Sequence, residues 1–394
     1  MRLAIFGLTI SSSWGNGHAT LWRGLGKALV ALGHEFIFFE RDVLYYANTR
    51  DWSSLPDTFR NCELVLYGDW SSIRSRVRRE LENCDCGMVT SYCADAIPAT
   101  DEILDALGPR AVFYDLDTPI TLDRLRAGKE LAYIPARGLR DFDLVLSYTG
   151  GAALEQLRDV LGARHVEALY GHADPDTHRP VPPIADYRAD LSWLGTYSAD
   201  RQTALEELFV SPARLRPADK FLIGGAQYPE HFPWSENVYF VHHVPPAEHA
   251  AFLSSSRLTL NVTREPMARM GWCPSGRLFE AAACGAAVLS DQWRGLDSFY
   301  SPGQQILTAC GANDTLAAMD MSDAQLQSIG RAARERTLDE HTSRHRAAQL
   351  ISCLERSSTA LPHSTPAGTR IEHAHAHGHE HEHDWDRDRD RMWR

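Results

Sequence analysis

The sequence predicts an α/β protein of two doubly wound domains, each built on a parallel β-sheet with helices on both faces. The chain has 394 residues, which exceeds the size that a single hydrophobic core usually supports. Short apolar β-like runs alternate with helical patterns along it, a pattern typical of βαβ units. A proline-rich passage interrupts this alternation near the middle, and the alternation then restarts. These three observations favour two similar domains in series.

The first domain is expected over residues 1–183. It opens with a β-like run at 3–6, a glycine-rich loop over 7–17, and a helix whose leucines recur near the helical period until Gly33. Further β-like runs lie at residues 35–39, 64–67, 87–90, 111–114, 144–147 and 166–169. The passage 171–183 then carries Pro175, Pro180, Pro182 and Pro183, which prevent a continuous helix or a central strand. We therefore place the domain boundary there.

The second domain is expected over residues 184–355. A β-like run at 191–194 is followed by a loop at 195–198 and a helix over 199–209. Further β-like runs lie at 220–223, 238–242, 258–262 and 287–290, and helical patterns at 323–336 and 342–355 complete the domain. The two domains repeat the same kind of fold without a detectable sequence repeat.

Composition excludes several classes of protein. The net charge of −12 argues against a nucleic-acid partner, because phosphate backbones demand clustered Lys and Arg. The basic run 74–79 is the local exception, and a solvated helix face is its simpler interpretation. No apolar run approaches the roughly 20 residues of a membrane span, and the N-terminal run is too short for a signal peptide. Eight scattered cysteines without a C-x-x-C pair indicate a reduced, cytoplasmic setting.

Residues 356–394 differ in composition from the rest of the chain. They contain too few apolar residues to offset the entropy of ordering, so we expect a disordered tail. Its alternating histidines are His373, His375, His377, His379, His381 and His383. Such a series can bind zinc, nickel or copper weakly, although a solvated tail with incidental metal affinity is the simpler interpretation.

The most informative stretch for function is residues 261–300. A β-like run enters a loop with Arg264, and Pro274-Ser275-Gly276 then opens a short helix over 277–284. The start of a helix behind such a turn presents free N–H groups and a positive dipole end to an anion. Glu280 lies about one turn into this helix, where its carboxylate could accept two neighbouring sugar hydroxyls. The combination suits a nucleotide diphosphate with its ribose.

The order of motifs resembles that of the GT-B glycosyltransferases, and within them the CgeB-type branch, which is similar to spore maturation proteins. The matching motifs are Tyr114 to Pro119 (YDLDTP), Ala173-Asp174-Pro175, Leu194 to Tyr197 (LGTY) followed by Arg201, and Pro274 to Gly285 (PSGRLFEAAACG). The resemblance spans roughly residues 1–355 and implies two Rossmann-like domains facing each other across a cleft. It also implies that the second domain holds most of the donor. Retaining members of the wider group often carry an acid seven positions before the helix glutamate, where this chain has Cys273.

The expected site combines residues from both domains. The donor-binding candidates are Gly195, Thr196, Arg201, His243, Arg264, Ser275, Gly276, Arg277 and Glu280. Backbone groups at Ser275 and Gly276, helped by Arg264 or Arg277, would hold the diphosphate, and the loop at Gly195 is a second candidate for that role. Ordinary ion pairs are the alternative for the arginines, and a first-turn acid that complements the helix dipole is the alternative for Glu280.

In the first domain, Trp14, Gly15, Asn16 and Gly17 are the acceptor-binding candidates, because open α/β sheets bind ligands at the carboxyl edge. His18 opens a helix, where its pKa would tend to fall, and it is one candidate base. Asp117 is the other candidate base. Capping or packing is the alternative for His18, and lining a domain interface is the alternative for Trp14.

The function expected is transfer of a sugar from a nucleotide diphosphate sugar to a hydroxyl acceptor, without a metal in the active site or a further cofactor. A nicotinamide-dependent oxidoreductase is one alternative, because Glu40 stands at the end of the second β-like run. Its glycine motif is incomplete, with Thr20 in place of the third glycine. A non-catalytic nucleotide- or sugar-binding protein is the other alternative, and Cys273 is its main support.

Overall fold

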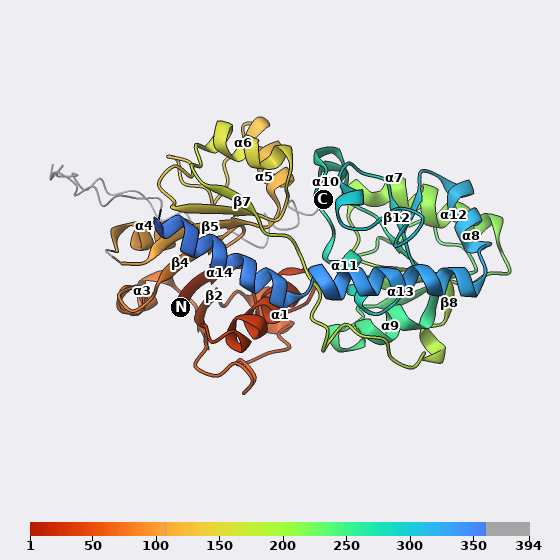
Figure 1. The fold of residues 1–394 in the computed structure, drawn as a ribbon, viewed down its shortest axis with the longest axis horizontal. Helices are drawn as coiled ribbons and strands as arrows, with labels where there is room; N and C mark the ends of the chain where they lie inside the picture. The colour runs from red at the N-terminus through yellow and green to blue at the C-terminus, as the bar shows by residue number, and fades with distance from the viewer. Residues whose placement is uncertain (107, 360–394) are drawn as a thin grey trace.

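The computed structural model describes residues 1–106 and 108–359, which form two α/β lobes joined side by side (Figure 1). The sheet of the first lobe has seven parallel strands in the order β3-β2-β1-β4-β5-β6-β7. Its strands are β1 (Arg2–Gly7), β2 (Glu35–Arg41), β3 (Glu63–Tyr67), β4 (Cys86–Thr90), β5 (Arg110–Asp115), β6 (Leu144–Ser147) and β7 (Val166–Ala168). The helices that connect them are α1 (His18–Ala31), α2 (Leu44–Asn48), α3 (Trp70–Leu81), α4 (Ala96–Asp105), α5 (Thr118–Arg126) and α6 (Ala152–Leu161). The strand order reverses between β1 and β4, as in a doubly wound sheet.

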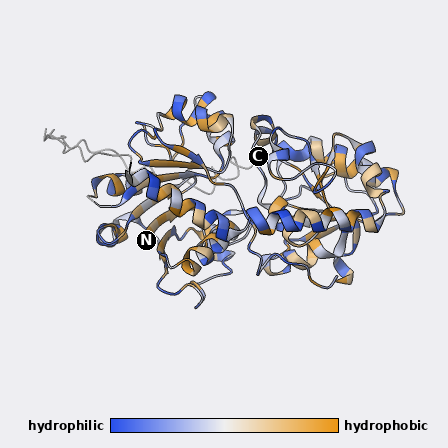
Figure 2. Cartoon of the chain, in the orientation of Figure 1, coloured by the Kyte–Doolittle hydropathy of each residue, from blue (hydrophilic) through white to orange (hydrophobic). Residues whose placement is uncertain are grey.

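Both faces of the first sheet are buried, and alternate residues of β1 show why. Ala4 and Phe6 belong to the core on one face, with side chains of α3 and α4. Leu3 and Ile5 belong to the core on the other face, with side chains of α1. Because both faces are covered, the strands read as continuous apolar runs, and Figure 2 shows them mainly in the hydrophobic colour.

The sheet of the second lobe has six parallel strands in the order β10-β9-β8-β11-β12-β13. They are β8 (Ala189–Leu194), β9 (Phe221–Gly225), β10 (Val238–His242), β11 (Ser256–Asn261), β12 (Val288–Asp291) and β13 (Leu307–Ala309). The α-helices of this lobe are α7 (Gln202–Leu205), α8 (Ser211–Leu215), α9 (His249–Ser255), α10 (Glu265–Met270), α11 (Gly276–Ala283), α12 (Ala312–Met319) and α13 (Asp323–Glu340). The order reverses between β8 and β11, so both lobes share one topology.

The last helix, α14 (Ser343–Thr359), returns to the first lobe and packs along α1 (Figure 1). Its buried face contributes Ala347, Leu350, Ile351 and Leu354 to the core shared with Trp22 of α1. The final helix of the range expected for the second domain thus belongs to the core of the first. A helical pattern fixes which side chains share a face, but it does not indicate which lobe that face covers.

The expected strands are present, and further differences concern short elements and the ends of helices. Strand β13 has only three residues and was not expected. The expected helix over 199–209 is instead a continuous helical segment to Leu215, in which a 3₁₀ turn, α7, a π-helical turn (Glu206–Val210) and α8 follow one another. Helix α14 also extends to Thr359, into the range expected to be disordered. The tail histidines from His373 to His383 lie outside the described residues.

No helix in the described part of the chain is long and apolar enough to cross a membrane.

Helix α14 predicts a large stability effect for a single truncation. Leu350 is 0% exposed in the core between α14 and α1. Leu350→Ala leaves a cavity there, and we expect it to lower the free energy of unfolding by about 2–5 kcal/mol in chemical denaturation. The exposed Arg344 of the same helix provides the control, for which Arg344→Ala is expected to change it by less than about 0.5 kcal/mol. Equal effects of the two substitutions would contradict the packing of α14 on the first lobe.

Candidate active site

A cavity of about 280 Å³ lies between the two lobes, near the lower end of the range for small-molecule sites. Its walls are loops at the carboxyl ends of the strands. Residues 13–18 follow β1 in the first lobe, whereas Gly195 follows β8 and Arg264 follows β11 in the second. These strands are the ones at which the strand order of each sheet reverses. Crevices at such switch points are the usual ligand sites of open α/β sheets.

The cavity gathers nearly all of the residues predicted from the sequence. The predicted residues that line it are Gly15, Asn16, Gly17, His18, Asp117, Gly195, Thr196, Arg201, His243, Arg264, Ser275, Gly276, Arg277 and Glu280. Trp14 is the exception. Its ring packs at 4.3 Å from the ring of His243 and 5.5 Å from that of His242, measured between centroids. It therefore lies in the contact between the lobes, which is the alternative that the sequence left open.

The start of α11 faces the cavity. Ser275 is the N-cap, and its hydroxyl accepts a hydrogen bond from the Arg277 amide at 3.3 Å. Within the described residues, no hydrogen bond engages the amides of Ser275 or Gly276. A side chain at Gly276 would point toward the Tyr148 hydroxyl and the Glu280 carboxylate, at more than 3.5 Å from each. The amides that open this helix are thus available to an anion in the cavity.

Glu280 lies one turn further along α11 and is only 5% exposed. Arg277 donates a hydrogen bond to its Oε2 atom and another to Nδ1 of His249, the latter at 2.9 Å. Burial raises the pKa of Glu280, but Arg277 and the neighbouring His178 and His172 together hold the pKa below its ordinary value. The carboxylate is therefore ionised and can accept hydrogen bonds from two hydroxyls of a ligand.

Two more guanidinium groups approach the cavity from the second lobe. Arg264 donates a hydrogen bond to Asp200 at 2.8 Å. It therefore forms an ion pair, which was the alternative to diphosphate binding, while it also lines the cavity. Arg201 donates a hydrogen bond to the Thr196 carbonyl at 3.3 Å. Burial and the positive charge of the neighbouring Arg264 both lower the pKa of Arg201. Asp200 attracts both guanidinium groups, so the protein itself partly compensates this pair of like charges.

The first lobe contributes His18 and Asp117 to the opposite wall. His18 is the first residue of α1, and its backbone amide is capped by Oδ1 of Asn16 at 3.0 Å. Burial lowers the pKa of His18 against the opposing attraction of Asp117, so the imidazole is neutral at physiological pH. Its Nδ1 atom is buried and has no hydrogen-bond partner in the described residues. Asp117 precedes α5 as its N-cap residue, without a side-chain capping bond.

Asp115 serves the turn rather than the cavity. It is fully buried, accepts the backbone N–H of Asp117 at 3.1 Å and accepts the Thr121 hydroxyl at 3.1 Å. Burial raises its pKa to about 6. Asp115 thus shapes the Asp-Leu-Asp-Thr-Pro turn, whereas Asp117 lines the cavity.

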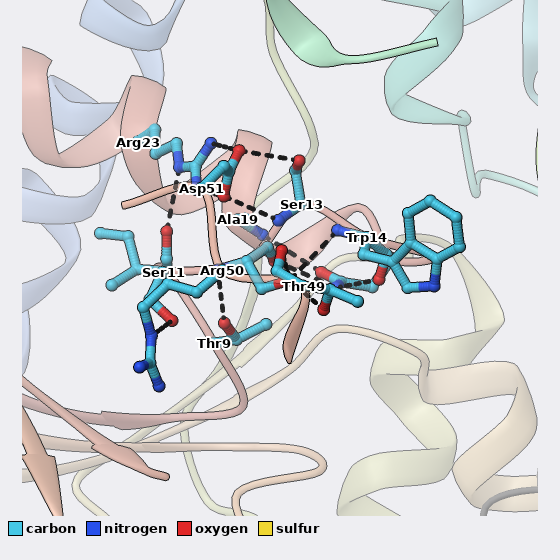
Figure 3. A network of polar contacts seen from close by, with 12 residues as sticks. Thr9, Ser11, Ser13, Trp14, Ala19, Arg23, Thr49, Arg50 and Asp51 are labelled. Carbon is cyan, nitrogen blue, oxygen red and sulfur yellow. Dashed lines mark hydrogen bonds and ion pairs between the residues drawn. The ribbon is translucent and has the colours of Figure 1, made fainter. Parts of the chain in front are cut away.

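The loop between β1 and α1 is held rigid by polar contacts (Figure 3). Glu40 is 0% exposed and accepts hydrogen bonds from Thr9, Ile10 and Ser11. Further along the loop, Ser13 donates to Asp51, which also pairs with Arg23. These hydrogen bonds hold residues 9–13 in place, so residues 15–18 face the cavity in a defined position.

Sequence reasoning missed four side chains of this region: Tyr148, His172, His178 and His249. Tyr148, His172 and His249 line the cavity, and His178 lies buried beside Glu280. His172 and His178 belong to the proline-rich passage, for which the sequence predicts only a domain boundary. Their proximity to the strand-following loops depends on how the lobes pack, which no local pattern indicates.

The comparisons with known proteins agree with this architecture. Residues 201–352 match the family model described as glycosyl transferase-like. Sucrose-phosphate synthase from Thermosynechococcus elongatus has a similar structure, with a TM-score of 0.66 and 14% identity over 92% of this chain and 100% of that one. The chain has the GT-B fold. This fold was the one implied by the sequence resemblance.

Two further structures share the GT-B fold with this chain. Anabaena HepE in complex with UDP and glucose has a TM-score of 0.61 and 13% identity, over 90% of this chain and 100% of that one. An α-glucosyltransferase in complex with UDP and a 13-mer DNA has a TM-score of 0.63 and 12% identity, over 90% and 99% of the two chains. No curated protein sequence matches this chain significantly.

Two buried histidines, His172 in the cavity wall and His341 beside Phe299, predict a loss of stability in mild acid. Burial lowers the pKa of His172 to about 3 and that of His341 to about 4, whereas both titrate near 6.5 when unfolded. Below that value the unfolded chain binds more protons than the folded one, so stability falls as the pH falls. We expect each histidine to contribute about 1.4 kcal/mol per pH unit between about pH 6 and pH 5.

Denaturant unfolding at a series of pH values measures this dependence, and His172→Gln serves as the comparison. The substitution removes one titrating group, so the slope of stability against pH is expected to decrease by about 1.4 kcal/mol per unit. An unchanged slope would show that His172 is protonated in the folded protein.

Proposed function

We propose that this protein transfers a sugar, most simply a hexosyl group, from a nucleotide diphosphate sugar to a hydroxyl acceptor. The observation that supports this proposal is the opposition of two walls across one cavity. The second lobe offers the open start of α11, three guanidinium groups and an ionised Glu280. The first lobe offers a neutral His18 and Asp117. One wall suits a diphosphate with its ribose, and the other suits an acceptor hydroxyl.

Departure of the diphosphate is the step that these charges would stabilise. The amides of Ser275 and Gly276 together with Arg264 and Arg201 provide fixed donors on one side of the cavity. Fixed donors that are already oriented toward developing charge account for most of the rate enhancement in many enzymes. Glu280 would accept hydrogen bonds from the two ribose hydroxyls, and the backbone near His243 would contact the nucleobase. UDP is the first nucleotide to test, because HepE and the α-glucosyltransferase were solved with it.

A base must take the proton of the acceptor hydroxyl as the glycosidic bond forms. His18 is the better candidate of the two first-lobe groups, because its lowered pKa leaves a nitrogen lone pair at neutral pH. Its unpartnered Nδ1 and the nearby Asp117 would allow the imidazolium to be stabilised once it has gained the proton. The CgeB-type likeness of the motifs is part of the same proposal.

The two alternatives are less well supported. A nicotinamide dinucleotide would require Glu40 for its ribose. The Glu40 carboxylate instead accepts hydrogen bonds from Thr9, Ile10 and Ser11 of the loop. A non-catalytic binding protein is favoured only by Cys273, which is buried and accepts the Thr149 hydroxyl at 3.0 Å. Burial raises the pKa of this thiol to about 12, so it carries no charge. Turnover of a nucleotide sugar distinguishes a transferase from this alternative.

Glu280→Gln tests the ribose contact. The amide keeps the size of the side chain but loses its charge and one acceptor, so we expect UDP to bind about 10- to 100-fold more weakly by calorimetry. The exposed Glu335 of α13 provides the control, and Glu335→Gln is expected to leave the affinity unchanged. Unchanged UDP affinity in a folded Glu280→Gln protein would remove the ribose role.

We also propose that transfer needs no metal ion, because the arginines and the helix start already supply positive charge. EDTA is expected to leave the initial rate of sugar transfer within about twofold of the untreated rate, because no step of the proposed mechanism passes through a cation. A complete loss that Mg²⁺, Mn²⁺ or Zn²⁺ restores would contradict this part of the proposal.

A further inference from the structure

Three buried side chains meet beneath the ribose-binding end of the cleft. His178 comes from the passage between the lobes, His249 begins α9, and Glu280 lies in α11. Nε2 of His178 and Nδ1 of His249 each lie 3.9 Å from Oε2 of Glu280, and the three ligand atoms are all within 4.8 Å of one another. Two imidazole nitrogens and a carboxylate oxygen form a donor set that zinc and similar ions prefer.

His178 is the first independent sign of a ligand at this point. It is 3% exposed, and neither of its ring nitrogens has a hydrogen-bond partner among the described residues. Leaving a buried polar group unsatisfied costs about 1–3 kcal/mol. The ring nevertheless directs Nε2 toward Glu280. A bound ion would satisfy that nitrogen.

The second sign is the tautomer of His249. Its Nε2 atom lies 3.1 Å from the carbonyl oxygen of Val244, and a carbonyl can only accept, so Nε2 carries the proton. The lone pair is therefore on Nδ1, which faces Glu280. A ring N–H donated to a backbone carbonyl is the usual second contact of a metal-binding histidine, because it fixes the tautomer and the ring orientation.

Arg277 currently supplies positive charge to this cluster. Its Nη1 atom donates to Nδ1 of His249 at 2.9 Å and also to Oε2 of Glu280. The Arg277 side chain is 29% exposed, so it can swing into the cleft without leaving a buried charge. A metal ion and Arg277 therefore compete for the same two lone pairs.

We propose that His178, His249 and Glu280 form an inhibitory site for a divalent transition-metal ion, for which Zn²⁺ is the best match. Tetrahedral ligands around zinc lie roughly 3.4 Å apart, so small side-chain rotations bring these atoms into range. Glu280 and His249 also line the cavity, which leaves the fourth position to water. The effect on catalysis rests on the proposed function, because an ion on Glu280 removes the acceptor that the ribose requires. Binding of the ion does not depend on that function.

The test of binding uses the full chain with all seven tail histidines, His363 and the six from His373 to His383, changed to glutamine, so that the tail histidines do not contribute. Co²⁺ is titrated into this protein, and the visible absorption of tetrahedral Co²⁺ reports the site. We expect one tight site that His178→Gln weakens at least about 100-fold, because a ligand is lost. Arg277→Ala is expected to tighten it about tenfold, because the competing guanidinium is gone. Equal Co²⁺ binding with and without His178→Gln would overturn the proposal.

The test of inhibition compares sugar transfer by the same two proteins. Zn²⁺ is expected to slow the parent at least about tenfold, with EDTA restoring the rate, whereas the His178→Gln protein keeps its basal rate in Zn²⁺. Equal inhibition of both proteins would refute an inhibitory role at this site. Absence of transfer in both proteins without metal would instead refute the proposed function, and the Co²⁺ titration would still decide the metal site.

Discussion

The buried charge of Glu280 is the constraint around which the second lobe of the cleft is arranged. An ionised carboxylate removed from water costs several kcal/mol unless it is paired. Arg277 provides that pairing from three positions earlier on the same helix, which is the spacing at which helical side chains meet. The pair lies within the first turns of α11, where the helix dipole also favours a negative group. Any ligand that engages Glu280 must therefore replace or share the contact with Arg277.

This constraint connects the two proposals made for the cleft. Ribose hydroxyls can share the carboxylate with Arg277, because each carboxylate oxygen accepts more than one hydrogen bond. A metal ion cannot share it, because a cation beside the guanidinium would be repelled. The nucleotide and the ion thus make opposite demands on Arg277. The nucleotide lets Arg277 stay in place, whereas the metal ion displaces Arg277 from its contact with His249.

The sequence predicted most of the fold because strands and helix starts are set by neighbours in the chain. The alternation of apolar runs located the strands, and Pro274-Ser275-Gly276 located the opening of α11. The approach of His178 and His249 to Glu280 could not be predicted, because it depends on how the passage between the lobes, α9 and α11 pack against one another. The packing of α14 on the first lobe could not be predicted for the same reason, because it depends on tertiary packing. Its apolar face is visible in the sequence, whereas its partner α1 lies more than 300 residues earlier.

The connections between the lobes explain how charges on separate sheets are held opposite one another. Ser343 at the start of α14 contacts His172 at 2.9 Å, and Lys27 of α1 pairs with Asp174 in the same passage at 3.1 Å. Trp14 of the first lobe packs against His242 and His243 of the second. These contacts join the loop after β1, and α1 that begins with His18, to the lobe that carries Glu280. Because preorganised charge is effective only where its geometry is maintained, the packing between the lobes is as much a part of the site as the residues that line it.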